Sequence, residues 1–259
     1  MGFLDTLRQH VQPMRHPPES ELVRSLWEQR DLDGIRARLE APATATRVRA
    51  FEAAAGVAEP PVVDLATDVL ARRLADGDDE DTIEAITLLR GGAQSPTLIS
   101  AVEFFGALSE ERAFGLKTVT SKAVVNADVI KPLLLNEVHD PEPIFVVPWC
   151  ATAALVELGE RSEDVARLLV EAAEHVMTWL VTNDACSRIN GYMLASVVRD
   201  ETLALLSSFT GIPAAREAIV EIMHGERLLG CLSGTDVPDF ESTIEFAQQA
   251  LAAFDNPRA

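Results

Sequence analysis

The sequence predicts an all-α protein, a curved solenoid of stacked antiparallel helix pairs, with an irregular helical bundle as the alternative. Apolar residues recur at helical spacing, and short clusters of Pro, Gly, Ser or Asp separate these stretches. Strand patterns are nearly absent. The one serious strand candidate is residues 144–147, and it leads into a helical stretch. The starts of successive helix pairs also recur at a regular interval, which is typical of a solenoid.

The N-terminal elements are short. Helices are predicted at residues 3–11, 19–30 and 31–41, with a Pro-rich linker at 12–18, and an Ala-rich helix then extends to about residue 58. Pro60 and Pro61 fit the first turn of the next helix, where proline is tolerated. The apolar stripe of that helix is Val62, Leu65, Ala66, Val69 and Leu70.

Capping residues mark the later boundaries. Asp81 fits an N-cap with Glu84 as its capping-box partner, and Gly91 ends that helix. Further helix starts are predicted at Ser95, Ser109, Asp128 and Ser162. The last helices are expected at residues 187–199, 200–209, 212–224 and 238–254.

The helix pairs follow a repeat. Their starts fall near residues 31, 60, 95, 128, 162 and 200, a spacing of roughly 29 to 38 residues. One helix pair cannot cover its own apolar face, so pairs stack until a capping helix presents a polar outer face. We therefore predict a single domain over residues 1–259, with about six pairs. N-terminal capping helices occupy 1–30, the repeat body 31–225, and a loop with a C-terminal capping helix 226–259.

Three stretches resemble HEAT repeats. In DPEPIFVVPWCATAALVELGE, residues 140–160, the prolines would form the turn between paired helices and Ala-Ala-Leu would pack inward. RVRAFEAAAG, residues 47–56, has the Val-Arg pair of the family, and AAREAIVEI at 214–222 is a weaker copy. In the first stretch Val-Val stands where the family has Val-Arg. The resemblance covers residues 31–225 and implies a HEAT-like fold whose concave face holds another protein.

Some HEAT-like proteins are enzymes, and the residues argue against two such classes. Deoxyhypusine hydroxylase-like proteins bind two irons through His-Glu pairs, whereas this chain has five His and no His-Glu dipeptide. HEAT-like DNA glycosylases need a basic groove with aromatic residues, whereas this chain is acidic with one Tyr. A lyase-like or other small-molecule-handling protein, or a structural subunit of a larger complex, remains the alternative. No catalytic residue, metal ligand or cofactor is predicted.

The charge of the chain is uneven. Net charge is −19 overall, but residues 1–50 hold 8 Arg and 7 acidic residues, whereas residues 51–259 hold 14 basic and 34 acidic residues. An acidic body repels nucleic acid and anionic membranes, so neither is expected as a partner. We expect a non-enzymatic scaffold or adaptor that binds a protein with a basic segment. The alternative explanation of the acidic charge is that it keeps the protein soluble or adapts it to salt.

Candidate binding residues are few. Arg36, Arg38, Arg47 and Arg49 would lie on adjacent helices and form a basic patch for an acidic peptide or phosphate, or else surface and inter-repeat ion pairs. Phe104 and Phe105 are adjacent, so both cannot face one core layer and one is expected at a partner contact. The acidic run at residues 76–81 allows calcium binding, but an acidic helix N-terminus explains it better.

The remaining composition indicates a cytoplasmic protein of prokaryotic type. The three cysteines are widely spaced without a CxxC motif, which favours reduced core thiols. The longest apolar run contains Pro148 and is too short to cross a bilayer. The N-terminus lacks the basic start and apolar core of a signal peptide.

Overall fold

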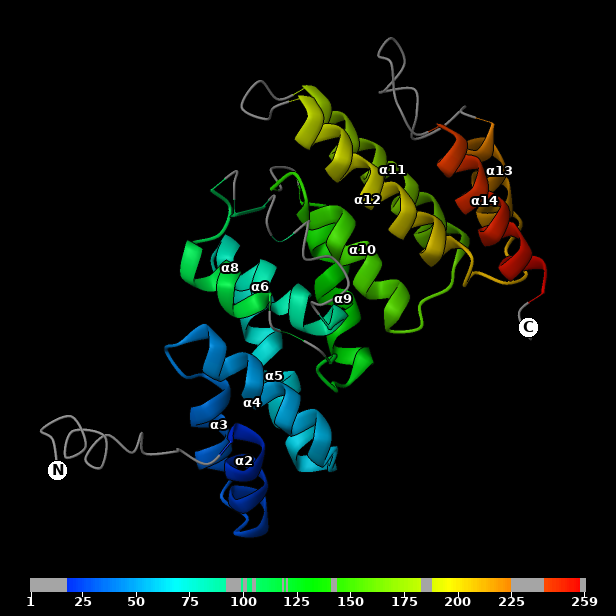
Figure 1. The fold of residues 1–259 in the computed structure, drawn as a ribbon. Helices are drawn as coiled ribbons and strands as arrows, with labels where there is room; N and C mark the ends of the chain where they lie inside the picture. Colours follow the sequence, from blue (N-terminus) through cyan, green and yellow to red (C-terminus); the bar gives the residue numbers. More distant parts are fainter. Residues whose placement is uncertain are drawn as a thin grey trace, which may run out of the picture.

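The computed structural model describes residues 18–91, 99, 102–103, 106–117, 119, 121–140, 144–182, 188–224 and 240–256. All regular structure in these residues is helical, which confirms the all-α prediction for the described part (Figure 1). The principal helices are α2 (Glu19–Glu28), α3 (Leu32–Leu39), α4 (Thr44–Val57), α5 (Pro60–Asp76), α6 (Asp79–Arg90), α8 (Glu110–Leu116), α9 (Ala127–Val138), α10 (Val147–Glu157), α11 (Glu163–Thr182), α12 (Arg188–Leu206), α13 (Pro213–Met223) and α14 (Phe240–Asp255). The predicted helix at 3–11 lies outside the described residues.

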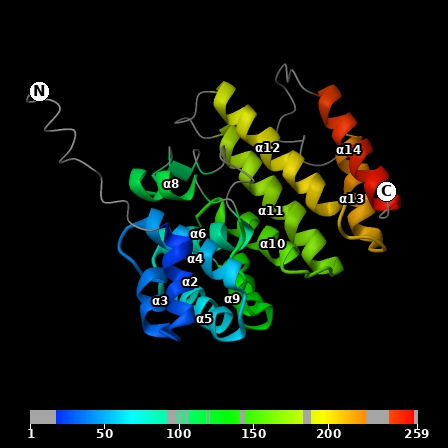
Figure 2. The same ribbon diagram turned by 60° about the horizontal axis from the view of Figure 1, so that its bottom comes forward.

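The helices pack in chain order, from α2 at one end of the molecule to α14 at the other (Figures 1 and 2). Chain neighbours contact each other, as α4 contacts α5 and α11 contacts α12. Helices two places apart also pack together, as α2 does with α4, α3 with α5, α11 with α13, and α12 with α14. The contacts of α5 with α9 and of α6 with α10 join the two halves. One hydrophobic cluster therefore runs from Val23 to Phe254.

Small side chains let α10 pack closely against its neighbours. Ala151, Ala153 and Ala154 are fully buried there, beside the equally buried Trp149. An alanine surface lets helix axes approach more closely than a leucine surface, so more backbone is brought into van der Waals contact. Burial of these residues agrees with the inward direction expected from the repeat-like sequence of this stretch.

Several predicted helix ends are confirmed. Pro60 and Pro61 occupy the first turn of α5, where their missing N–H groups cost no helical hydrogen bond. Gly91, the predicted end of α6, has a φ of +68°, and Gly159 after α10 has a φ of +88°. Only glycine adopts this left-handed conformation without strain, so it ends a helix efficiently.

The predicted N-cap of α6 is wrong by three residues, and the predicted start of α9 at Asp128 is one residue late. The N-cap of α6 is Asp78, whose carboxylate accepts a hydrogen bond from the Asp81 N–H at 2.9 Å. Asp81 therefore lies inside the first turn, and Glu84 turns to a tertiary partner instead of closing a capping box. The N-cap of α9 is Asn126, whose side chain accepts from the Asp128 N–H at 3.1 Å. Runs of polar residues offer several equivalent caps, and tertiary packing selects one.

The chain around residue 200 forms one helix where two were expected. The single helix α12 extends through the predicted break. No Gly or Pro interrupts the sequence there, and the Asp200 carboxylate accepts from the neighbouring Arg199 side chain at 2.8 Å instead of capping a new helix. Residues 144–147, the one strand candidate, form a turn that enters α10 at Val147.

The outer face of the last helix, α14, is mostly polar. Glu245, Gln248 and Gln249 are exposed there, and Phe246 is the one large apolar side chain on that face among those described. A polar outer face suits the end of a stack, because no further helix covers it. Among the described residues, no helix is long and apolar enough to cross a membrane.

Candidate functional site

Arg47, one of the four arginines predicted for a binding patch, lies inside the protein. Its side chain is 5% exposed and its guanidinium donates to the two carboxylate oxygens of Glu84, at 2.7 and 2.5 Å. The remaining donors bond the carbonyls of Ala41 and Pro42 and the hydroxyl of Thr44, at 2.6–2.9 Å. A guanidinium has five N–H donors, and all five are used. Arg47 therefore offers nothing to an external ligand.

Glu84, the partner of Arg47, is fully buried in α6 and is bridged to further cations. Arg73 of α5 donates to its carboxylate at 2.9 Å, and Arg112 of α8 lies 3.9 Å away. Burial by itself would lower the pKa of Arg47, but the hydrogen bonds and charge of Glu84 outweigh burial and raise it. Arg47 therefore stays charged, and its pair with Glu84 joins α4, α5, α6 and α8 in one network.

Arg36 and Arg38 are also engaged by carboxylates, on different sides of α3. Arg36 donates to Asp68 of α5 at 2.7 Å, and this hydrogen bond lowers the pKa of Asp68. Arg38 forms a two-pronged pair with Glu19 of α2, at 2.5 and 2.7 Å. The four predicted arginines thus do not form one patch. Arg36 and Arg38 are paired with carboxylates, Arg47 is buried, and only Arg49 stays exposed without a carboxylate partner among the described residues.

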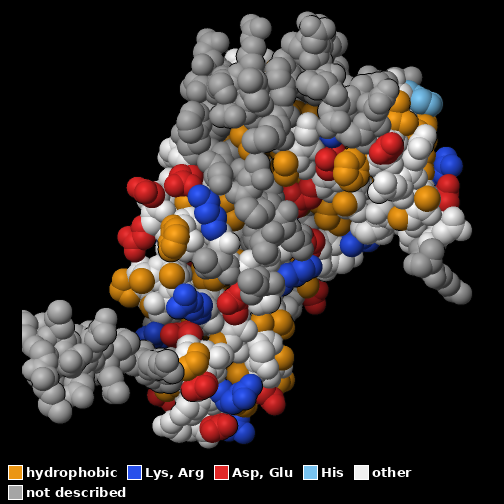
Figure 3. Space-filling view, viewed as in Figure 1, with side chains coloured by type: hydrophobic (Ala, Val, Ile, Leu, Met, Phe, Trp, Pro, Cys, Tyr) orange, Lys and Arg blue, Asp and Glu red, His pale blue; other side chains and the backbone are white. Residues whose placement is uncertain are grey.

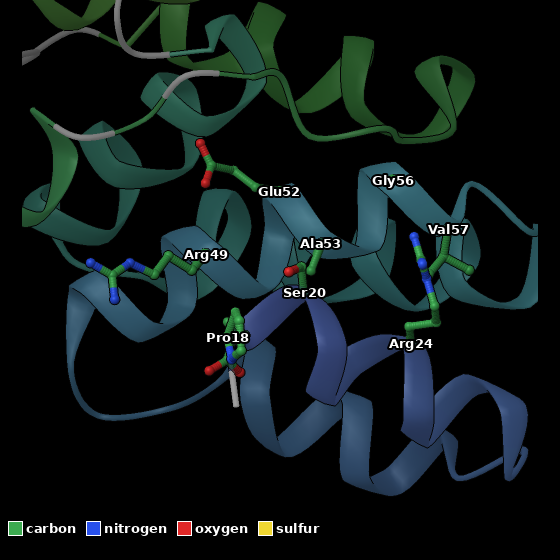
Figure 4. A pocket seen from close by; sticks show the side chains of 9 residues that line it. Pro18, Ser20, Arg24, Arg49, Glu52, Ala53, Gly56 and Val57 are labelled. Carbon is green, nitrogen blue, oxygen red and sulfur yellow. The ribbon is translucent and has the colours of Figure 1, made fainter. Parts of the chain in front are cut away.

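Arg49 lines a groove of about 420 Å³ between α2 and α4 (Figure 4). The remaining lining residues are Pro18, Glu19, Ser20, Arg24, Glu52, Ala53, Gly56 and Val57. Because the α4 residues follow at spacings of three and four, they form one face of that helix. The floor is small and partly apolar, whereas Arg24 and Arg49 stand at opposite sides of the groove (Figure 4).

A second exposed surface is centred on α8. Phe114 is 70% exposed, the largest value among the described large hydrophobic side chains. Glu110 and Glu111 lie one helical turn before it on the same exposed side. In the space-filling view, carboxylates and hydrophobic side chains adjoin at the left edge, where α8 lies in Figure 1 (Figure 3). The predicted contact residues Phe104 and Phe105 lie outside the described residues.

Arg112 brings the acidic first turn of α6 beside α8. Its guanidinium lies 3.1 Å from Glu80 and 3.0 Å from Asp81, and the Ser109 N–H donates to Glu80 at 2.7 Å. Asp78 caps α6, as described above, and remains exposed. These carboxylates are thus used for ion pairing and capping, and no group of three or more candidate ligands suited to a metal ion occurs among the residues described.

A buried polar cluster lies between α6, α10 and α12. The Arg90 guanidinium ion-pairs with Glu157, at 3.6 Å, and with Glu201, and it stacks over Trp149 at 5.0 Å. It also donates to the Cys150 thiol at 3.6 Å. Burial raises the pKa of Cys150, although Arg90 opposes the shift, so this cysteine is a poor nucleophile. The cluster ties three helices together and faces no described groove.

Sequence reasoning missed the two most accessible candidates, Arg24 and Phe114. Arg24 belongs to a short polar helix that was interpreted only as a cap, and Phe114 follows two glutamates in an unremarkable stretch. The local signal for Phe114 was weak, because its immediate neighbours are Ala113 and Gly115 and the charged residues lie two to four positions before it. No local signal marks Arg24, since its groove is completed by α4.

Comparisons with known proteins found no match to a protein-family model, to a curated protein or to a solved structure.

Proposed function

We propose that this chain is a HEAT-like α-solenoid that acts as a non-enzymatic scaffold, binding a partner protein through a basic and apolar segment. The proposed contact surface is the Phe114 surface, defined as Phe114 with Glu110 and Glu111. The single observation that carries the proposal is the 70% exposure of Phe114 beside these carboxylates.

The order of helix contacts supports the solenoid. Near both ends of the described structure, contacts between chain neighbours are accompanied by contacts between helices two places apart, as in stacked helix pairs, whereas in the middle α4 packs on α8, α5 on α9 and α6 on α10. In such a stack each pair adds surface without closing the structure, so a long face stays available for another chain. The mostly polar outer side of α14 fits the terminal cap expected at the C-terminal end.

The chemistry of the Phe114 surface supports the choice of partner. Exposed aromatic side chains are frequent centres of binding energy, because they bury a large area with few rotatable bonds. Glu110 and Glu111 have no ion-pair partner among the described residues, so a Lys or Arg of the partner can pair with either. The net charge of −19 disfavours a second copy of this acidic chain as the occupant.

Affinity capture of the tagged protein from its own cell extract tests the proposal. We expect to capture a stoichiometric partner whose binding is lost in Phe114→Ser. The double variant with Glu110→Gln and Glu111→Gln should bind that partner more weakly, and its binding should be less sensitive to added salt. Phe246→Ser is the matched control, because Phe246 is 43% exposed on the distant α14. Each captured protein is then purified and titrated against wild type and variants by calorimetry.

Two results contradict the proposal in distinguishable ways. If a partner binds Phe114→Ser as tightly as it binds the wild type, the scaffold proposal stands but the Phe114 surface is not its binding site. If no stoichiometric protein is captured and the purified chain carries a bound small molecule, the scaffold proposal is rejected and a ligand-handling role is favoured.

A further inference from the structure

Most basic side chains in the described part of this acidic protein are paired with carboxylates. The paired residues are Arg36, Arg38, Arg47, Arg72, Arg73, Arg90, Arg112, Lys117, Lys122, Lys131, Arg167, Arg199 and Arg216. Such pairing is expected where 41 acidic residues surround 22 basic ones. Among arginines and lysines whose side chains are described, the exceptions are Arg24, Arg30, Arg49 and Arg161.

Two of these exceptions have other partners. Arg30 stacks over the Trp27 ring at 4.0 Å, which satisfies its cationic face. Arg161 donates to the carbonyls of Val156 and Glu160 and lies over Phe209 at 5.3 Å. Arg24 and Arg49 remain, and each is exposed without a described hydrogen-bond, ion-pair or ring partner.

Arg24 and Arg49 line the same groove, although they lie on different helices (Figure 4). The two carboxylates of that groove do not neutralise them. Glu19 is held by both prongs of Arg38, and Glu52 is engaged in an interaction of its own. The groove therefore has a free guanidinium group at each of two opposite sides, with small residues between them, in the one near-neutral part of the chain.

We propose that the groove between α2 and α4 binds an extended acidic segment of a partner protein, whose Asp or Glu carboxylates accept hydrogen bonds from Arg24 and Arg49. Guanidinium groups bind carboxylates in a two-pronged geometry, and such charge-assisted hydrogen bonds are stronger than neutral ones. Between them, Ala53 and Gly56 leave room for the backbone of the segment, since a Cβ atom at Gly56 meets nothing within 4 Å. This site differs in residues and in charge preference from the Phe114 surface and does not depend on it.

A synthetic peptide tests this site directly. The wall of the groove from Arg49 to Val57 rises ~12 Å along α4, so an extended peptide of about six residues, ~20 Å long, covers it. The probe is a fluorescein-labelled peptide of alternating Glu and Ala, titrated with the full chain and followed by fluorescence anisotropy. The matched peptide of alternating Gln and Ala has the same length without the carboxylates.

We expect the Glu peptide to bind and the Gln peptide not to bind. Arg24→Gln and Arg49→Gln should each weaken binding about tenfold, the effect of losing one charge-assisted hydrogen bond. Gly56→Trp should abolish binding by filling the groove while leaving both arginines in place. Arg167→Gln is the control, since Arg167 is exposed on α11 and pairs only with Asp164 in the described structure.

Four results would overturn the proposal. Equal binding of the Glu and Gln peptides would show that carboxylates are not recognised, and unchanged binding by both arginine variants would place the peptide elsewhere. Competition by inorganic phosphate at concentrations below those of the peptide would assign the groove to a phosphate ligand. Self-association of the wild type that disappears in Arg49→Gln, measured by sedimentation, would assign it to a second copy of the chain.

Discussion

Arg47 and Glu84, which lie 37 positions apart in the chain, form a buried two-pronged ion pair between α4 and α6 at 2.7 and 2.5 Å. Burying two charges is costly, and the cost is offset here because every donor of the guanidinium has an acceptor. The pair fixes the register of α4 against α6, and α4 also forms one wall of the groove. The buried residue thereby positions the exposed one, Arg49, two places further on.

Removing the Arg47 guanidinium should destabilise the fold strongly. Arg47→Met leaves the Glu84 carboxylate buried with only part of its compensating charge, which costs about 3–5 kcal/mol of unfolding free energy. Arg49→Met on the same helix is the matched control and should change stability by less than about 0.5 kcal/mol. Urea denaturation followed by circular dichroism measures both, and equal midpoints for the two variants would contradict the buried pair. Binding tests should therefore use Arg24 and Arg49, because a variant lacking all four predicted arginines would also be destabilised.

Two glycine substitutions should have opposite effects on stability. Alanine favours a helix over glycine by about 1 kcal/mol at either position. Gly56→Ala in α4 meets nothing within 4 Å and should stabilise the protein by roughly that amount. Gly115→Ala in α8 would place its Cβ 2.7 Å from the Thr44 methyl carbon, so overpacking of about 1–3 kcal/mol should outweigh the helical gain. Thermal unfolding distinguishes the signs, and a stabilising Gly115→Ala would refute the close packing of α8 on α4.

Glu137 should make stability fall as pH rises from acid toward neutral. Partial burial, with the nearby charge of Asp140, raises the pKa of Glu137 above its ordinary value. The folded state therefore holds this proton more tightly than the unfolded state. The resulting stabilisation is fully present below the unfolded pKa and is lost as pH rises through the folded pKa.

Glu137→Gln should remove this dependence. Relative to wild type, the variant should have the higher melting temperature at neutral pH, with the gap closing below about pH 4, where the wild-type carboxyl is protonated in both states. The measurement is Tm by calorimetry across that range, with Glu171→Gln on the exposed side of α11 as the control. A gap that widens toward acid pH would reverse the assigned direction of the pKa shift.

Helical boundaries were predictable from the sequence wherever one residue type dominates the local energetics. Pro60 and Pro61 begin α5 and Gly91 ends α6, because proline lacks an N–H group and glycine tolerates the left-handed conformation in any tertiary context. Prediction was wrong where several residues compete for one role. Asp78 and Asp81 are both able to cap α6, and the choice between them depends on which carboxylate Arg112 and Arg73 draw into ion pairs.

The sequence by itself determined that the described chain is helical, since apolar periodicity and the Pro and Gly boundaries act within a few residues. Tertiary structure alone decided which arginines are accessible. Arg47 and Arg49 have the same side chain and nearly the same neighbours, but they lie on opposite sides of α4, and only packing against α6 shows which side is buried. Burial of a charge requires a compensating partner, and that partner, Glu84, is brought close only by the fold.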